Sequence, residues 1–80
     1  PMAQKILPPD ELRQIREIDL GLSRAELARL LETTIFMVQR WERPADRQSH
    51  VLPPHRVVRL MEAYRAGYRP SDWPVEGGAA

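Results

Sequence analysis

Arginine, glutamine and phenylalanine share one side of a predicted helix near the middle of the chain. At about 100° per residue, Phe36, Arg40 and Arg43 fall together, with Gln39 and Met37 beside them. In the major groove of DNA, arginine pairs bidentately with guanine, glutamine pairs with adenine, and apolar groups contact the thymine methyl. These residue types at this spacing therefore favour contact with base edges over simple exposure to solvent.

Other reactive residue types are sparse. The chain has no cysteine and two histidines, His50 and His55. Zinc sites use three or four ligands, so this pair falls short of a metal site. The spacing of the other residues gives no Ser–His–Asp set, no glycine-rich phosphate loop and no carboxylate pair. We therefore expect no enzymatic activity, no cofactor and no metal.

Two capped helices and a tight turn must position the outward side. Ser23 followed by Glu26 is a capping box, in which each side chain bonds to the backbone N–H of the other residue. Thr34 can cap the next helix through its hydroxyl, which leaves a turn of about three residues. Behind the capping box lies an apolar stripe of Leu27, Ala28, Leu30 and Leu31. The segment predicts a helix-turn-helix.

The second helix of this pair also has an inward side, formed by Val38, Trp41 and Glu42, with Ile35 at its edge. Trp41 is predicted to lie in the core because it shares a side with Val38. For Phe36 we expect exposure and a contact with thymine methyls or a partner. Arg40 is expected to read a base, with a solvated salt bridge to a nearby glutamate as the alternative.

Helices are also predicted before and after this pair. The first covers residues 9–19, opens with prolines and acids, ends at Gly21, and has its apolar positions at Leu12, Ile15 and Ile18. Pro44 forces a break, followed by a polar loop to Pro53. The last helix starts at Pro54 and stops near Gly67, with a buried side of Val57, Leu60, Met61 and Tyr64.

Length and composition predict one small domain. The 80 residues divide into an amino-terminal segment 1–8, a helical domain 9–67 and a Pro/Gly-rich tail 68–80. In the tail, Tyr68 and Trp73 are expected to fold back onto the core. No apolar run has the length of a membrane span, and the amino terminus does not resemble a signal peptide. With no cysteine, a soluble cytoplasmic protein is expected.

The positive charge is unevenly distributed along the chain. The net charge is only +1, and eleven of the twelve basic residues are arginine. Residues 36–59 carry five arginines against Glu42 and Asp46. Because the planar guanidinium matches phosphates and guanine edges, this distribution favours a nucleic-acid partner.

From about Leu12 to Tyr64, the chain resembles the phage-repressor and Cro-like helix-turn-helix proteins, often called XRE-like. Their typical run, GLSxxELAxxLGxSxxxIxxWExG, corresponds here to GLSRAELARLLETTIFMVQRWERP. The matching positions are Gly21, Leu22, Ser23, Glu26, Leu27, Ala28, Leu31, Val38, Trp41 and Glu42. The resemblance implies an all-α fold, a compact four- to five-helix bundle of the lambda-repressor-like type.

The resemblance also implies site residues. The positions that touch base edges in similar proteins are held here by Ile35, Phe36, Gln39 and Arg40. Phosphate contacts are expected from Arg24, Thr34 and Arg43, and the loop residue Arg47 is a further candidate. Proteins of this family commonly bind two-fold related half-sites as dimers.

Three departures from the family run affect the turns. Glu32 replaces the usual turn glycine, so a positive φ there would strain the turn. Pro44 replaces the glycine that follows the second helix. One more residue than usual separates Arg16 from Gly21, which puts in question the ion pair that the family's arginine often makes with Glu42.

The sequence as a whole favours a double-stranded-DNA-binding transcriptional regulator. We expect a repressor that occupies an inverted-repeat operator as a homodimer, with its own promoter as one option. The alternative is a protein-interaction module, or an antitoxin, that uses Ile35, Phe36 and Met37 as an apolar docking surface.

Overall fold

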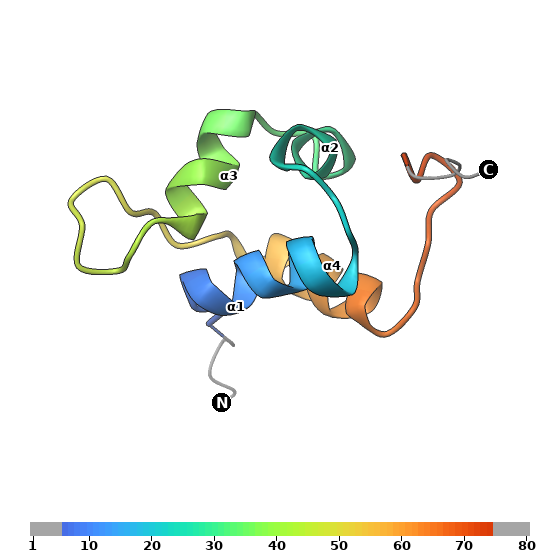
Figure 1. Cartoon of the computed structure of the whole chain (residues 1–80), viewed down its shortest axis with the longest axis horizontal. Coiled ribbons are helices and arrows are strands. Elements are labelled where there is room, and N and C mark those ends of the chain that lie inside the picture. Colours follow the sequence, from blue (N-terminus) through green and yellow to red (C-terminus); the bar gives the residue numbers. More distant parts are fainter. Residues whose placement is uncertain (1–5, 75–80) are drawn as a thin grey trace.

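The computed structural model describes residues 6–74 and is all-helical over that range, as predicted. Its elements, in chain order, are α1 (Pro9–Gln14), the π-helical segment η1 (Ile15–Asp19), α2 (Arg24–Leu30), α3 (Ile35–Glu42) and α4 (His55–Arg65). Helix α1 and η1 form one continuous rod that runs in front of α4, and α2 and α3 stand together above them (Figure 1). None of the described helices is both long and apolar enough to cross a lipid bilayer.

The rod of α1 and η1 begins and ends where the sequence predicted, but its second half has a different register. Pro9 opens it, and Gly21 follows its end with φ of +66°. In η1 the N–H of Leu20 donates to the oxygen of Ile15 at 2.9 Å, one residue farther than in an α-helix. This wider turn rotates the side chains, so the prediction that Ile18 is a core position is wrong: its side chain is 70% exposed. Leu20 and Leu22 are buried instead.

The predicted helix caps of α2 and α3 are confirmed. The N–H of Glu26 donates to Ser23 Oγ at 3.1 Å, and the N–H of Ser23 donates to Glu26 Oε1 at 2.9 Å. Thr34 Oγ1 accepts the N–H of Met37 at 3.1 Å. Between the helices lies the turn 31–34, in which Glu32 has φ of +56°. This left-handed backbone is one that glycine adopts without penalty and glutamate does not.

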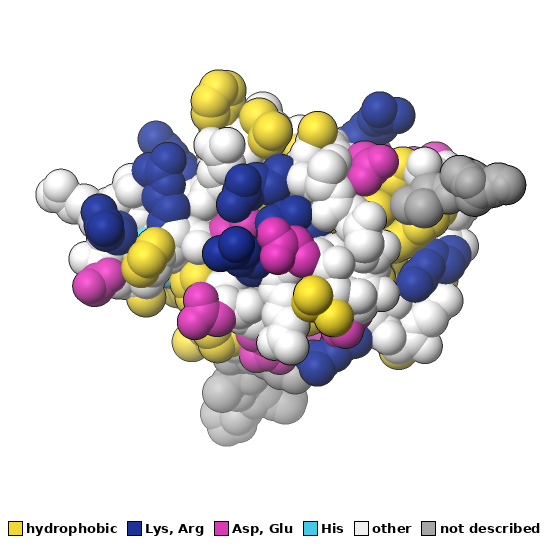
Figure 2. Space-filling model, viewed as in Figure 1, with side chains coloured by type: hydrophobic (Ala, Val, Ile, Leu, Met, Phe, Trp, Pro, Cys, Tyr) yellow, Lys and Arg dark blue, Asp and Glu magenta, His cyan; other side chains and the backbone are white. Residues whose placement is uncertain are grey.

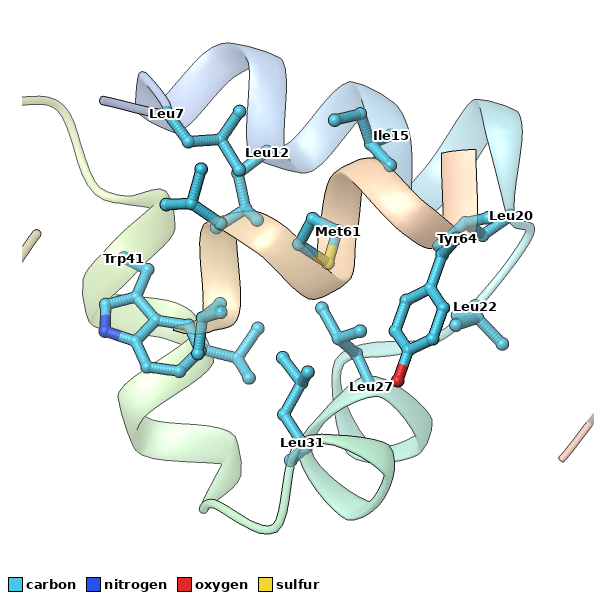
Figure 3. Close-up of a cluster of buried hydrophobic side chains, with 14 residues drawn as sticks. Leu7, Leu12, Ile15, Leu20, Leu22, Leu27, Leu31, Trp41, Met61 and Tyr64 are labelled. Atoms are coloured by element: carbon cyan, nitrogen blue, oxygen red, sulfur yellow. The ribbon is translucent and has the colours of Figure 1, made fainter. Parts of the chain in front are cut away.

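The core lies where the four α-helices meet. Leu27 from α2 and Leu31 directly after that helix point toward Met61 on α4, and Trp41 from α3 closes one side (Figure 3). The prediction that Trp41 is a core residue is confirmed, with 2% of its surface exposed. On α4, Val58 is buried in addition to the predicted residues, whereas Leu60 is only partly buried.

The segment that follows α4 packs back onto the core through aromatic contacts. The ring of Trp73 meets the buried ring of Tyr64 edge-on, with centroids 5.2 Å apart. Tyr68 stacks nearly parallel to Tyr64, with ring centroids 6.0 Å apart, but remains about half exposed. The prediction is therefore confirmed for Trp73 and only in part for Tyr68. This segment and the loop after α3 lie at opposite ends of the molecule (Figure 1).

Candidate nucleic-acid interface

The outward side of α3 carries the residues that the sequence assigned to base contacts. Phe36 is 70% exposed, Ile35 and Arg40 are also exposed, and Gln39 is half-buried. Within residues 6–74 Arg40 makes no ion pair, so the salt bridge considered as its alternative role does not form there. Basic side chains gather over the middle of the molecule and toward the loop that follows α3 (Figure 2).

The apolar surface at the start of α3 is smaller than the sequence suggested. Met37 is partly buried and packs against the core. It lies four residues before Trp41, so both side chains fall on the same side of the helix. Met37 therefore offers less apolar surface than the exposed pair Ile35 and Phe36.

A buried carboxylate lies at the other end of α3. The Glu42 side chain is 2% exposed and accepts three hydrogen bonds from two arginines. Arg16 Nε donates to Glu42 Oε2 at 2.6 Å, and its Nη2 donates to Oε1 at 3.1 Å. Arg24 Nε donates to Oε1 at 3.0 Å. The cluster ties η1, α2 and α3 together.

The Arg16–Glu42 ion pair, which the spacing to Gly21 put in question, does form, and η1 gives the reason. An i→i+5 turn holds one more residue than an α-helical turn. It therefore takes up the additional residue between Arg16 and Gly21 while Arg16 stays in place. Arg16 Nη1 also donates to the backbone oxygen of Leu22 at 2.9 Å, which fixes the chain as it enters α2.

Glu17 extends this cluster to the surface. Its Oε2 accepts Arg16 Nη2 at 3.2 Å and Arg13 Nε at 3.4 Å. Desolvation acts to raise the pKa of Glu17, but the charges and hydrogen bonds of Arg13 and Arg16 outweigh it and lower the pKa. The carboxylate is thus kept ionised beside the arginines.

The structure places Arg24 differently from a simple surface arginine. Its side chain is 40% exposed, yet its Nε is bound to Glu42. Nothing in the spacing of the sequence indicated this contact, because the two residues lie 18 positions apart on different helices. Thr34, the neighbouring phosphate candidate, is exposed, and its hydroxyl oxygen caps α3.

The loop after α3 holds the remaining phosphate candidates. The backbone of Arg43 is extended because Pro44 follows it. The N–H of Val51 donates to the oxygen of Arg40 at 3.3 Å, which returns the loop to the end of α3. The side chains of Arg43 and Arg47 are exposed and make no ion pair within the described part of the chain. Both are available to an anionic partner.

The histidines lie in the loop after α3 and at the first residue of α4. His50 Nε2 is buried without a hydrogen-bond partner, and no group of three potential metal-ligating side chains occurs among residues 6–74. On α4 an open hollow of about 330 Å³ is lined by Arg56, Arg59, Leu60 and Ala63. Arg56 Nη1 donates to the oxygen of Leu31 at 3.4 Å and so binds a free carbonyl after α2.

Comparison of the chain with protein-family models, with curated protein sequences and with solved structures found no match. The functional assignment consequently rests on the residues and on their geometry.

Proposed function

We propose that the chain is a sequence-specific double-stranded-DNA-binding regulator in which α2 and α3 act as a helix-turn-helix. In this proposal α3 enters the major groove. The observation that carries it is the outward side of α3, where Gln39 and Arg40 lie beside the exposed Phe36. Arg40 has no internal ion pair to give up, at least within the described residues. Opposite it, Val38 and Trp41 hold the helix rigidly on the core.

The roles divide between the two kinds of contact. Arg40 and Gln39 read base edges, and Ile35 and Phe36 contact thymine methyls. Arg24, Thr34, Arg43 and Arg47 contact phosphates and fix the register of the protein on the duplex. The chain represses by occupying a promoter, and a homodimer places two α3 helices on the two halves of an inverted repeat.

Selection from a pool of random-sequence duplexes tests this function. The expected result is an enriched inverted repeat with half-sites about 10 base pairs apart, one turn of the duplex. Sedimentation of the complex should show two chains per duplex. Failure to enrich any sequence, together with no retardation of any duplex at 50 mM salt, would contradict the proposal.

A second candidate function rests on the exposure of Phe36. At 70% exposure beside Ile35 it offers an apolar anchor for a protein partner, as in an antitoxin. A competition experiment relates the two functions. A selected duplex should displace a protein bound at Phe36 only if DNA and protein use the same α3 surface. Phe36→Ala should weaken binding of the selected duplex if Phe36 contacts thymine, and should leave it unchanged if Phe36 serves a protein alone.

A further inference from the structure

The buried carboxylate of Glu42 binds two arginines that differ in how many of their hydrogen-bond donors are already used. The Arg16 side chain is 5% exposed and donates hydrogen bonds to Glu42, Glu17 and the backbone oxygen of Leu22. Arg24 is 40% exposed and uses only its Nε. Its two terminal nitrogens have no partner within residues 6–74.

The bond at Nε restricts the orientation of the whole end group, because the guanidinium is planar and rigid. The bond to Glu42 Oε1 thus orients the terminal nitrogens of Arg24 before any ligand arrives. A guanidinium held this way can form two parallel N–H···O bonds with a phosphate. It also loses less rotamer freedom on binding than a mobile side chain does.

The charge of the cluster agrees with an anionic ligand. Arg13, Arg16 and Arg24 face two carboxylates, those of Glu17 and Glu42. One positive charge is left over, and Arg24 is the member whose terminal nitrogens are unengaged. We infer that Glu42 is a positioning residue that presents Arg24 to a phosphate of the DNA backbone, an inference that rests on the proposed function.

A purely structural role for Arg24 gives a different expectation. If Arg24 only neutralises the buried Glu42, a lysine at the same position would serve equally and DNA affinity would not depend on the fork. If Glu42 positions Arg24, a lysine that bonds to Glu42 has no second, oriented donor edge for a phosphate. Replacing Arg24 by lysine keeps the positive charge but removes the planar guanidinium, and so distinguishes the effect of charge from that of donor geometry.

The experiment compares the wild-type protein with Arg24→Lys, Arg24→Ala and the control Arg65→Ala. Arg65 is a comparable arginine, half-exposed and paired with Glu11 and Asp19, but lies on α4. Fluorescence anisotropy would give affinities for the selected duplex and a random 30-base-pair duplex over a range of salt. We expect Arg24→Ala and Arg24→Lys to weaken binding of both duplexes by roughly three- to tenfold, with the control within about twofold. Wild-type affinity for Arg24→Lys would overturn the inference.

A double-mutant cycle tests the part played by Glu42. In a Glu42→Gln background, Arg24→Ala should cost clearly less DNA affinity than it does in the wild type, because Arg24 is no longer oriented. Equal costs would overturn the inference. If Glu42→Gln does not fold, the Arg24 Nε–H resonance in the wild type decides: it should be protected from exchange in both free and DNA-bound protein, and rapid exchange in either state would overturn the inference. Absence of duplex binding by the wild type would instead refute the proposed function, and the inference with it.

Discussion

Consecutive residues at the end of α3 have opposite environments. Trp41 and the Glu42 side chain are buried, whereas Arg40 and Arg43 are exposed. The helical repeat places side chains three or four apart on one side. The helix is thereby anchored through one side while the other is left to a ligand.

Arg40 and Arg43 should respond differently to truncation. Arg40→Ala is expected to lower affinity for the selected duplex by about 1 to 3 kcal/mol while nearly sparing random DNA, because a base contact is sequence-dependent. Arg43→Ala should weaken both and flatten the salt dependence, because a phosphate contact is not. Anisotropy titrations would measure both variants. Equal losses on both duplexes for Arg40→Ala would remove its assigned role.

Glu32 carries backbone strain that glycine would relieve. With φ of +56° it lies in the left-handed region, where a side chain costs about 1 to 2 kcal/mol. Glu32→Gly should therefore raise the free energy of unfolding by about 0.5 to 1 kcal/mol, the remainder being lost to the greater freedom of unfolded glycine. Urea unfolding would measure this. Glu32→Ala is the control, since it keeps Cβ and should give no gain.

Tyr64 should make stability depend on alkaline pH. Burial, and to a lesser extent Tyr68 and Asp72, raises the pKa of Tyr64 above its ordinary value of 10.0. The folded state therefore favours the protonated phenol. The resulting contribution to the free energy of unfolding is present below pH 10 and is lost as pH rises through the higher folded-state pKa. Tyr64→Phe should lose less stability above pH 10 in thermal unfolding. An unchanged alkaline loss would contradict the attribution.

The π-helical segment η1 is the element whose geometry departs most from the regular helix that the sequence predicts, and it carries the Arg16 that binds Glu42. The i→i+5 turn turns Ile18 to the surface and leaves Arg16 on Glu42. The helix propensities of these residues do not distinguish such a turn from regular α-helix, because all of them occur in ordinary helices. The error at Ile18 and the doubt about Arg16 therefore have one cause.

Deleting Ile18 should convert η1 to regular α-helix without loss of the fold. The hydrogen bond from Leu20 to Ile15 would then span four residues. Arg16 precedes the deleted residue in the chain and would therefore keep its position. Circular dichroism should show cooperative unfolding and unchanged helicity. As a control, deletion of Arg59, which is also exposed, would rotate Met61 and Tyr64 out of the core. Loss of cooperative unfolding on deletion of Ile18 would refute this account of η1.

The elements that the sequence predicted well are those with local signals. The capping box at Ser23, the cap at Thr34 and the break at Pro44 follow from neighbouring residues alone. The Arg24–Glu42 contact joins different helices, and its geometry follows only from packing. Likewise, the partial burial of Met37 depends on the exact rotation of α3 against the core.

At the scale of the whole molecule, the candidate interface and the aromatic contacts of the segment after α4 lie apart. The loop that carries Arg47 and the segment that carries Trp73 extend from opposite ends (Figure 1). Arg69 lies 4.3 Å above the Trp73 ring, and its Nη1 donates to the oxygen of Tyr64 at 2.7 Å. The segment 68–73 is held by its own contacts with Tyr64, so a DNA ligand on α3 need not disturb it.

Nuclear magnetic resonance can show whether the outward side of α3 binds duplex DNA. Titration with the selected duplex should shift the Gln39 side-chain amide and the Nε–H signals of Arg24, Arg40 and Arg43. Signals of Ile18 and Arg65, on other surfaces, should move little. Shifts confined to residues outside α3 and the start of α2, or no shifts at all at low salt, would contradict the claim.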